Sequence, residues 1–389
     1  MVWGNRKFFR VILCTVFFLT MAAVYSMPAE AELGDVFKFS GPDVSSRAMG
    51  MGGAFTGTAD DVSALKYNPA GIGQQSSVDV YGSGGLYTLQ PENLENLWYI
   101  LSELEDDPEN DLSEIQSHLE NISQLTAGAQ FFGGVSLGSF AGAIRYHSSY
   151  FADQERQEDD ILIDNPVHLT GVLGMGQEIL TPALDIGALA YGVNLRMGQS
   201  SLTRYQLIMD EDQQDAEMIR INAEDIGYAL DAGLMIKFTD LVQGGLMVSN
   251  LLASEYELAG EKAVHELSPE GHWTEISRDD YSFGSYKPER KVRAGASFYV
   301  PVLAATIAAD VDNLLGAGES GQVLHLGMEK NIFLNALSIR GGLVEGAEDR
   351  FFTTGLGLNF LPLNLDTALM VDDSFSESVF FSLSANMKF

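Results

Sequence analysis

The chain ends in the stretch that decides its fold, Ser378-Val379-Phe380-Phe381-Ser382-Leu383-Ser384-Ala385-Asn386-Met387-Lys388-Phe389. One set of alternate residues is apolar: Val379, Phe381, Leu383, Ala385, Met387 and Phe389. The residues between them are polar, apart from Phe380. A pleated strand places alternate side chains on opposite faces, which an α-helix cannot do. The stretch is therefore predicted to be a β-strand with one apolar and one polar face.

The same period of two recurs upstream, for example over 350–360 and 225–238. Strands of about ten residues with one apolar face are typical of transmembrane barrels, although a soluble β-sandwich shows the same alternation. The pattern predicts strands near 76–89, 125–137, 140–151, 166–180, 184–208, 225–238, 242–258, 288–299, 302–312, 321–331, 336–345, 350–360, 363–371 and 376–389.

The connections between these strands distinguish a barrel from a sandwich. Long connections at 90–124, 152–165, 209–224 and 259–287 alternate with short ones such as 138–139. A barrel has long loops at one end and tight turns at the other, whereas a sandwich has no reason to separate them. We therefore predict an all-β fold, a transmembrane antiparallel β-barrel of about fourteen strands that spans 76–389.

The charge is strongly acidic and unevenly distributed. Lys and Arg number 22 and Asp and Glu number 54, which gives a net charge of −32. The four long loops together hold 28 of the acids. Charge kept at one rim stays out of the lipid band, where each charge costs ~2–4 kcal/mol at the midplane. A chain this acidic repels phosphate backbones, so we expect no nucleic-acid partner.

The first 31 residues have the pattern of a secretory signal peptide. Arg6, Lys7 and Arg10 precede an apolar core, and Ala29-Glu30-Ala31 follows it as a cleavage site. We predict that residues 1–31 are removed on export. The single cysteine, Cys14, lies within this segment, so we expect no disulfide, thiol catalysis or Cys-ligated metal in the exported chain.

The first outer loop has a helical pattern over 92–124. Leucines at 94, 97, 101 and 104 recur at spacings of three and four, and a second such run follows Pro108. We predict a helical insert in this loop. Two roles are open for it: a helix hairpin packed on the barrel rim, or a docking surface for a partner.

Residues 32–75 lack sustained alternation and carry three motifs. They are Arg47-Ala48-Met49-Gly50-Met51-Gly52-Gly53-Ala54-Phe55, then Ala59-Asp60-Asp61, then Tyr67-Asn68-Pro69-Ala70-Gly71. The glycines do not have the spacing of a phosphate-binding loop. Together the motifs resemble the N-terminal signature of the FadL-like outer-membrane barrels, and within them most closely the PorV-like and TraF-like (conjugal transfer) branches.

The resemblance implies that 32–75 forms a hatch inside a fourteen-stranded barrel, with hatch-motif residues Arg47, Gly50, Gly52, Gly53, Asn68 and Pro69. The terminal Phe389 resembles the assembly signal of bacterial outer-membrane proteins. We therefore expect the outer membrane of a Gram-negative bacterium as the location. The expected partners are outer-membrane lipid, lipopolysaccharide and the outer-membrane assembly machinery.

Two functions follow from the resemblance. The first is a plugged channel for passive transport of small hydrophobic or amphipathic molecules, and the alternative is a non-conducting scaffold of a secretion or conjugation complex. The six histidines are scattered and no Gly-x-Ser-x-Gly elbow occurs, so we expect a non-enzyme without cofactor or metal. The inward row is predicted to carry charges that pair across the lumen: Arg196, Asp231, Arg293, Asp310, Glu329 and Arg340.

Overall fold

A computed structural model describes most of the chain from Ser45 onward. The described residues are 45–89, 96, 99, 124–153, 160–180, 187–209, 216–267, 273–316, 321–346, 350–374 and 378–389. The predicted signal peptide at 1–31 lies outside them, as does the predicted helical insert at 92–124 except for Asn96, Tyr99 and Gln124.

Sixteen strands follow three short helical segments. The helical segments are α3 (Ser46–Gly50), α4 (Ala64–Tyr67) and the 3-10 helix η1 (Pro69–Gln74). A fourth helical turn, η4 (Pro301–Leu303), joins two strands. The strands are β1 (Val78–Leu89), β2 (Gln124–Leu137), β3 (Phe140–Asp153), β4 (Asp160–Leu180), β5 (Ala188–Met209), β6 (Ala216–Lys237), β7 (Val242–Ala253), β8 (Tyr256–Leu267), β9 (Trp273–Tyr286), β10 (Lys291–Val300), β11 (Ala305–Asp312), β12 (Val323–Ile332), β13 (Leu337–Glu345), β14 (Arg350–Phe360), β15 (Leu363–Asp372) and β16 (Ser378–Lys388).

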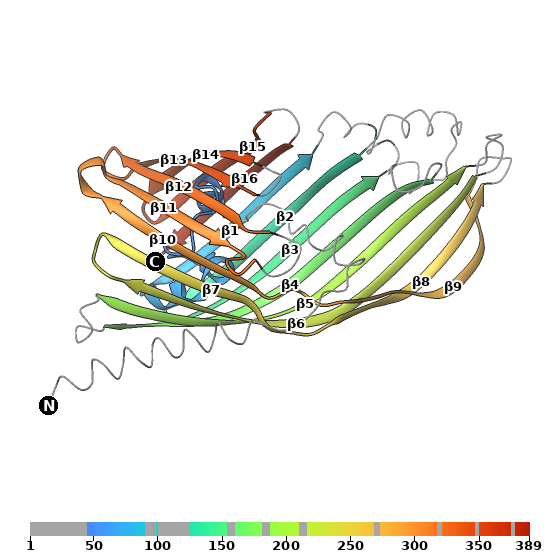
Figure 1. The fold of residues 1–389 in the computed structure, drawn as a ribbon, viewed down its shortest axis with the longest axis horizontal. Coiled ribbons are helices and arrows are strands. Elements are labelled where there is room, and N and C mark those ends of the chain that lie inside the picture. Colours follow the sequence, from blue (N-terminus) through green and yellow to red (C-terminus); the bar gives the residue numbers. More distant parts are fainter. Residues whose placement is uncertain are drawn as a thin grey trace.

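Fourteen of these strands form a closed antiparallel ring (Figure 1). Consecutive strands pair from β1 to β7, β7 pairs with β10, and consecutive strands pair again from β10 to β16. β1 closes the ring against β16, and the backbones of Val78 and Phe389 exchange hydrogen bonds of 2.9 and 3.3 Å at this seam. Closure leaves no free edge in the ring. The predicted barrel and its strand number are confirmed.

The remaining two strands, β8 and β9, form a hairpin that branches from β6. The half of β6 near the short turns pairs with β7, whereas residues 217–224 pair with β8. At the branch the β6–β7 register shifts around Asp231, and Asn250 has a φ of 54°. The shift bends β7 away from β6 and leaves the loop-side half of β6 for β8.

The prediction of one outer loop over 259–287 was therefore wrong, as was that of one strand over 242–258. The predicted loops at 152–165 and 209–224 were also too long, because β4 begins at Asp160 and β6 at Ala216. The reason is physical. At the start of β4 and over most of β8 and β9, charged residues interrupt the alternation of apolar and polar residues that marks a strand. The start of β6 does alternate over 219–224, but its acids led to the prediction of a loop.

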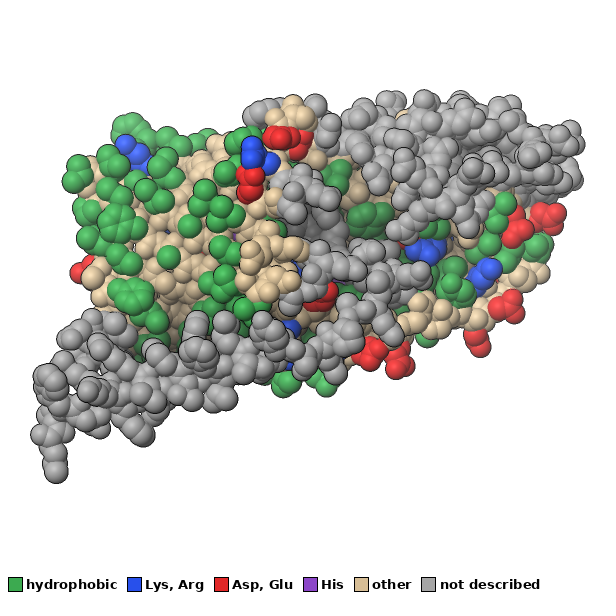
Figure 2. Space-filling view, viewed as in Figure 1, with side chains coloured by type: hydrophobic (Ala, Val, Ile, Leu, Met, Phe, Trp, Pro, Cys, Tyr) green, Lys and Arg blue, Asp and Glu red, His purple; other side chains and the backbone are tan. Residues whose placement is uncertain are grey.

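The face of the barrel drawn in Figure 2 divides into two zones where its residues are described. Hydrophobic side chains gather over the half that ends in the short turns, and acidic side chains lie over the half that carries β8 and β9. Outward residues on many strands are exposed apolar ones, such as Leu173, Ile226, Leu356 and Leu383. This arrangement matches the lipid-facing band of a transmembrane barrel. Within the described ranges, no helix combines the length and the apolar composition needed to span a membrane.

Candidate functional site

Residues 45–75, called here the inner segment, lie within the ring of strands (Figure 1). α3 contacts β13 to β16, and η1 contacts β3 to β6 on the other side. Phe55, Tyr67 and Ile72 are almost fully buried. The helices of the segment are short, and capping side chains begin two of them. Ser45 caps α3 by accepting a hydrogen bond from Ala48 N, and Asn68 caps η1 by accepting one from Ala70 N.

Glycines of the wall make room for the backbone of this segment. A Cβ atom at any of six inward positions, one on each of six strands, would overlap atoms of the inner segment: Gly176, Gly192, Gly233, Gly245, Gly327 and Gly342. Most of the atoms in question belong to the backbone, which cannot rotate away as a long side chain can. The barrel wall is therefore shaped for close contact with this segment.

Gly50, Gly52 and Gly53 of the inner segment allow the same close contact with the wall. Gly52 and Gly53 have φ values of 64° and 81°, a region in which side-chain-bearing residues are strained. A Cβ at Gly52 would also lie 2.7 Å from the Leu326 carbonyl oxygen, and one at Gly50 would lie 3.1 Å from Cα of Gly355. These residues bring the first turn of the inner segment against β12 to β14.

Hydrogen bonds between side chains and backbone join the inner segment to the wall. The Asp310 carboxylate accepts hydrogen bonds from Phe55 N at 2.9 Å and Thr56 N at 2.7 Å. On the other side, the Asn68 side chain donates to the carbonyls of Leu234 and Thr56, at 3.0 Å each. Buried backbone groups need partners. These contacts hold the irregular backbone in one place.

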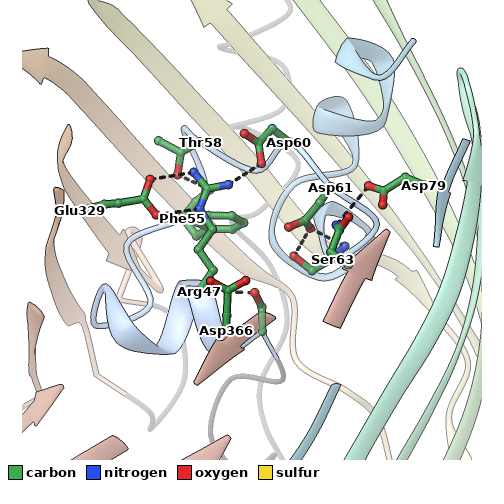
Figure 3. Close-up of polar contacts among 12 residues, drawn as sticks. Arg47, Phe55, Thr58, Asp60, Asp61, Ser63, Asp79, Glu329 and Asp366 are labelled. Atoms are coloured by element: carbon green, nitrogen blue, oxygen red, sulfur yellow. Dashed lines mark hydrogen bonds and ion pairs between the residues drawn. The ribbon is translucent and has the colours of Figure 1, made fainter. Parts of the chain in front are cut away.

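Arg47 is the charged anchor of the segment (Figure 3). Its guanidinium reaches Asp60 at 2.7 Å and Glu329 at 3.0 and 3.1 Å, and it lies 5.3 Å from the ring centre of Phe55. Glu329 also accepts a hydrogen bond from Arg340 at 2.6 Å, and Arg340 bonds Asp366 at 2.6 Å. The network links α3 to β12, β13 and β15, with the buried charges paired.

A cavity of about 340 Å³ lies directly on the loop side of the inner segment. Leu65 and Lys66 of α4 form part of its wall. Successive inward residues of a strand are two positions apart. On each of four neighbouring strands, one inward residue contacts the inner segment and the next inward residue lines the cavity. The pairs are Asn194 and Arg196 on β5, Gly233 and Asp231 on β6, Gly245 and Met247 on β7, and Gly295 and Arg293 on β10.

The cavity carries more basic than acidic side chains. Its lining includes five basic ones, Lys66, Arg145, Arg196, Lys291 and Arg293. It includes three acidic ones, Asp231, Glu289 and Asp312. Arg196 binds Asp231 through two hydrogen bonds of 2.8 and 3.0 Å, and Arg293 bonds Asp312 at 3.2 Å. Among the described residues of the lining, the basic side chains thus exceed the acidic ones by two.

Aromatic rings form another part of the lining. The imidazoles of His147 and His168 are parallel, with ring centres 6.3 Å apart. His147 Nε2 lies 2.9 Å from the Tyr87 hydroxyl, and His168 Nδ1 lies 2.9 Å from the Ser200 hydroxyl. Tyr256 and Tyr286, from β8 and β9, also line the cavity and stack with ring centres 6.5 Å apart. Within the described residues, no three His, Cys, Asp or Glu side chains gather into a metal site.

The residues singled out from the sequence fall into three groups. Arg47, Gly50, Gly52, Asn68 and Pro69 contact the wall, and Gly53 adopts the left-handed turn beside them. Glu329, Arg340 and Asp310 bind the inner segment or each other, whereas Arg196, Asp231 and Arg293 line the cavity. Phe389 is 67% exposed at the seam of the ring.

Sequence reasoning missed Lys66, Arg145 and His168 as parts of one site. The alternation of inward and outward residues could have identified part of the site. It places four lining residues on inward positions of β3 and β4: Arg145, His147, His168 and Thr170. The sequence does not indicate how far along the barrel axis the inner segment extends. It therefore does not indicate which inward residues the segment covers and which remain open to a cavity.

The comparisons bear on the fold. Neither a protein-family model nor a curated protein matches the sequence. Among solved structures, the chain is similar to the P. putida toluene transporter TodX, with 13% identity, a TM-score of 0.60, and coverage of 90% of this chain and 99% of that one. It is similar to a Pseudomonas aeruginosa FadL homologue, with 11% identity, a TM-score of 0.59, and coverage of 90% and 99%.

A third similar structure is the Ralstonia pickettii toluene transporter TbuX, with 12% identity, a TM-score of 0.55, and coverage of 91% and 100%. The chain thus has the fold of the FadL-like barrels over nearly its whole described length.

Proposed function

We propose that the protein is an outer-membrane channel of a Gram-negative bacterium for small hydrophobic or amphipathic molecules, and that the inner segment is its hatch. The observation that carries this proposal is the stacking of a cavity directly on the inner segment. A solute that enters from the loop side reaches the cavity and then meets Leu65 and Lys66. Onward passage requires the segment to move. The shared fold of the toluene transporters and the FadL homologue supports the same conclusion.

The irregular, short-helix structure of the inner segment suits it to movement. Its contacts with the wall include hydrogen bonds, small-residue packing, the Arg47–Glu329 ion pair and an apolar cluster, and they are made by side chains and loop backbone rather than by strand pairing, so they can be exchanged without unfolding the ring. A fourteen-strand ring is wide enough to need such filling. The hatch therefore closes the lumen at rest and opens it by a local rearrangement.

A reversible covalent lock tests this proposal. The hydroxyl oxygens of Ser46 on α3 and Ser382 on β16 are 2.7 Å apart. The paired substitutions Ser46→Cys and Ser382→Cys would thus join hatch to wall under oxidising conditions. We expect cellular uptake of a small apolar fluorophore to fall when the pair is oxidised and to recover on reduction. Each single substitution is the control and should respond to neither treatment. Equal uptake in the locked and reduced forms would contradict the proposal.

The β8–β9 hairpin favours a second function, an accessory barrel of a secretion or conjugation complex of the PorV-like or TraF-like kind. Among the described strands, β9 pairs only with β8. Its side chains include the exposed acids Glu275, Asp279 and Asp280. A projecting acidic strand with an unpaired edge suits a basic partner. Co-purification of a partner that is lost when the hairpin is deleted, together with uptake that is independent of the gene, would favour this function over the channel.

A further inference from the structure

Three neighbouring turns at the short-turn end of the barrel carry large apolar side chains. They join β10 to β11, β12 to β13 and β14 to β15, and they are neighbours because these six strands are consecutive in the ring (Figure 1). Residues 301–304, 333–336 and 361–362 are called here the apolar turns. Their tips hold the four most exposed large hydrophobic residues among those described: Leu334 at 102%, Val302 at 94%, Leu361 at 93% and Phe333 at 76%.

These turns do not have the composition of turns that face water. None of them contains a charged residue, whereas the β6–β7 turn at the same end includes the exposed Asp240. Phe333 and Leu334 also have φ values of 50° and 55°, a region that favours glycine or asparagine over a bulky side chain. A large apolar residue at either position is therefore disfavoured both by the backbone and by exposure to water. An apolar phase around the turn removes the second penalty.

The backbone of the apolar turns is bonded to the neighbouring strands of the ring. Asn359 also donates from its side chain to the Asn335 carbonyl oxygen at 2.7 Å. In lipid, each backbone polar group must find its partner within the protein. Three backbone hydrogen bonds meet this requirement by linking each turn to the next strand: Asn331 N to Ala304 O at 3.2 Å, Asn359 N to Ala336 O at 2.9 Å and Lys388 N to Pro362 O at 3.0 Å.

The strands are too short to fill an apolar band of lipid without these turns. Toward the loops, the band is limited by the exposed ion pair of Glu345 and Arg350, which lie opposite each other on β13 and β14. The outward residues below this pair are uncharged over 337–343 and 352–360. At a strand tilt of about 40°, these stretches rise about 16 and 21 Å, whereas the apolar band of a barrel is about 25 Å tall. The band therefore reaches the turns.

The apolar turns are continuous with the lipid-facing surface of the strands. Phe360, the last residue of β14, is 59% exposed and directly precedes Leu361. Lys330 carries a charge on the outer face of β12, four positions before Leu334. The stem of a lysine lies along apolar surface while its ammonium reaches the lipid headgroups. Lys330 therefore fits a membrane boundary close to the turns.

We propose that the apolar turns lie within the periplasmic leaflet of the outer membrane, where phospholipid acyl chains cover their four exposed side chains. Acyl chains adapt to separate protruding side chains, whereas a protein partner needs a matching pocket for each. The β6–β7 turn, with Asp240, stays in water, so the barrel is seated more deeply on the side of β10 to β15. The inference goes beyond the channel function and needs only a lipid-embedded barrel, so it stands or falls independently of transport.

Fluorescence quenching in phosphatidylcholine vesicles tests the inference. The only cysteine of the sequence, Cys14, lies in the predicted signal peptide, so Leu334→Cys and Thr239→Cys each give the exported chain one thiol for a bimane label. Thr239, exposed in the β6–β7 turn, is the matched control. We expect a spin label on the lipid acyl chain to quench bimane strongly at position 334 and weakly at position 239. Iodide in the water should do the reverse.

Heat-modifiable gel mobility verifies that both labelled variants are folded. Equal quenching of the two positions by lipid, or equal quenching by iodide, would overturn the inference. Alkylation by a bulky maleimide separates lipid from a protein partner. Leu334→Cys should be protected both in cell envelopes and in vesicles of pure lipid, and Thr239→Cys should react in both. Protection in envelopes that is lost in the vesicles would overturn the lipid assignment in favour of a protein partner.

A substitution that suits a turn in water provides a test without a label. Leu334→Asn places at a φ of 55° a residue that this region favours, so it should raise the urea midpoint of unfolding if water surrounds the turn. In an acyl-chain environment the amide loses its hydrogen bonds to water. We therefore expect a lower midpoint in lipid vesicles, with no change for the control Asp240→Asn. An unchanged or higher midpoint for Leu334→Asn would refute immersion of the turn.

Discussion

At the scale of single residues, the hatch depends on inward positions that carry no side chain. Gly342 on β13 lies against the backbone of Met51 and Gly52, whereas a Cβ on the adjacent Gly341 would meet only the Thr353 carbonyl oxygen at 3.8 Å. The two glycines are therefore a matched pair on one strand. One is needed for contact with the hatch and the other is not.

We predict that Gly342→Ala weakens docking of the hatch by about 1–3 kcal/mol, the usual penalty for overpacking. Trypsin cleavage after Arg47 or Lys66 measures the exposed fraction of the hatch and should accelerate in this variant. Gly341→Ala is the control and should be cleaved at the native rate. Equal cleavage of the two variants would show that the wall glycines do not hold the hatch.

A second prediction concerns Asp61, a residue of the hatch rather than of a strand. Burial, with the neighbouring charge of Asp60, raises the pKa of the Asp61 carboxyl above its ordinary value. A raised pKa in the docked state means that docking is most favourable below the ordinary value, and that this contribution is lost as pH rises through the raised value. Hydrogen exchange of the hatch should therefore slow as pH falls from neutral.

Asp61→Asn should remove this pH dependence, because the amide keeps the oxygen that accepts hydrogen bonds from Ser63 and cannot titrate. Comparing the two proteins at each pH cancels the intrinsic pH dependence of exchange. A variant with the same pH profile as the native protein would contradict the assignment to Asp61.

At the scale of elements, the β8–β9 hairpin is an addition to the ring rather than a part of it. β6 pairs with β7, and β7 pairs with β10, without any contribution from the hairpin. We predict that deletion of residues 256–286 leaves a closed barrel that still shows heat-modifiable gel mobility. A deletion variant that fails to assemble, or that migrates identically with and without heating, would show that the hairpin is needed for closure.

The alternation rule predicted the lipid-facing strands well and the extensions poorly, for one physical reason. β16, β14 and β15 have lipid on one face and the lumen on the other, so their polarity alternates. The start of β4 and most of β8 and β9 lie above the lipid, where both faces tolerate polar residues. The sequence therefore predicts a loop over 259–287, although hydrogen bonds between strands hold β8 and β9 in register there.

At the scale of the whole molecule, the ring could be predicted but the cavity could not. Ring closure follows from local alternation and from the order of short and long connections, both of which are visible in the sequence. The cavity depends on contacts between residues far apart in sequence, such as Leu65 with Asn194 and Thr56 with Asp310. The sequence predicted the charged residues of the lumen, but the prediction that they pair across it was wrong. Arg196 with Asp231, Arg293 with Asp312 and Arg340 with Glu329 pair between neighbouring strands of the wall. Arg47 with Glu329 and Arg293 with Asp312 became evident only in the structure.

The central claim is that the inner segment closes the lumen of an otherwise open ring, and planar-bilayer conductance tests it most directly. The intact protein should show little steady ionic current, because the segment and its paired charges fill the lumen. A variant that lacks residues 45–75, and that retains heat-modifiable mobility as proof of assembly, should show large and lasting openings. Large steady openings in the intact protein, or a closed barrel after the deletion, would contradict the account.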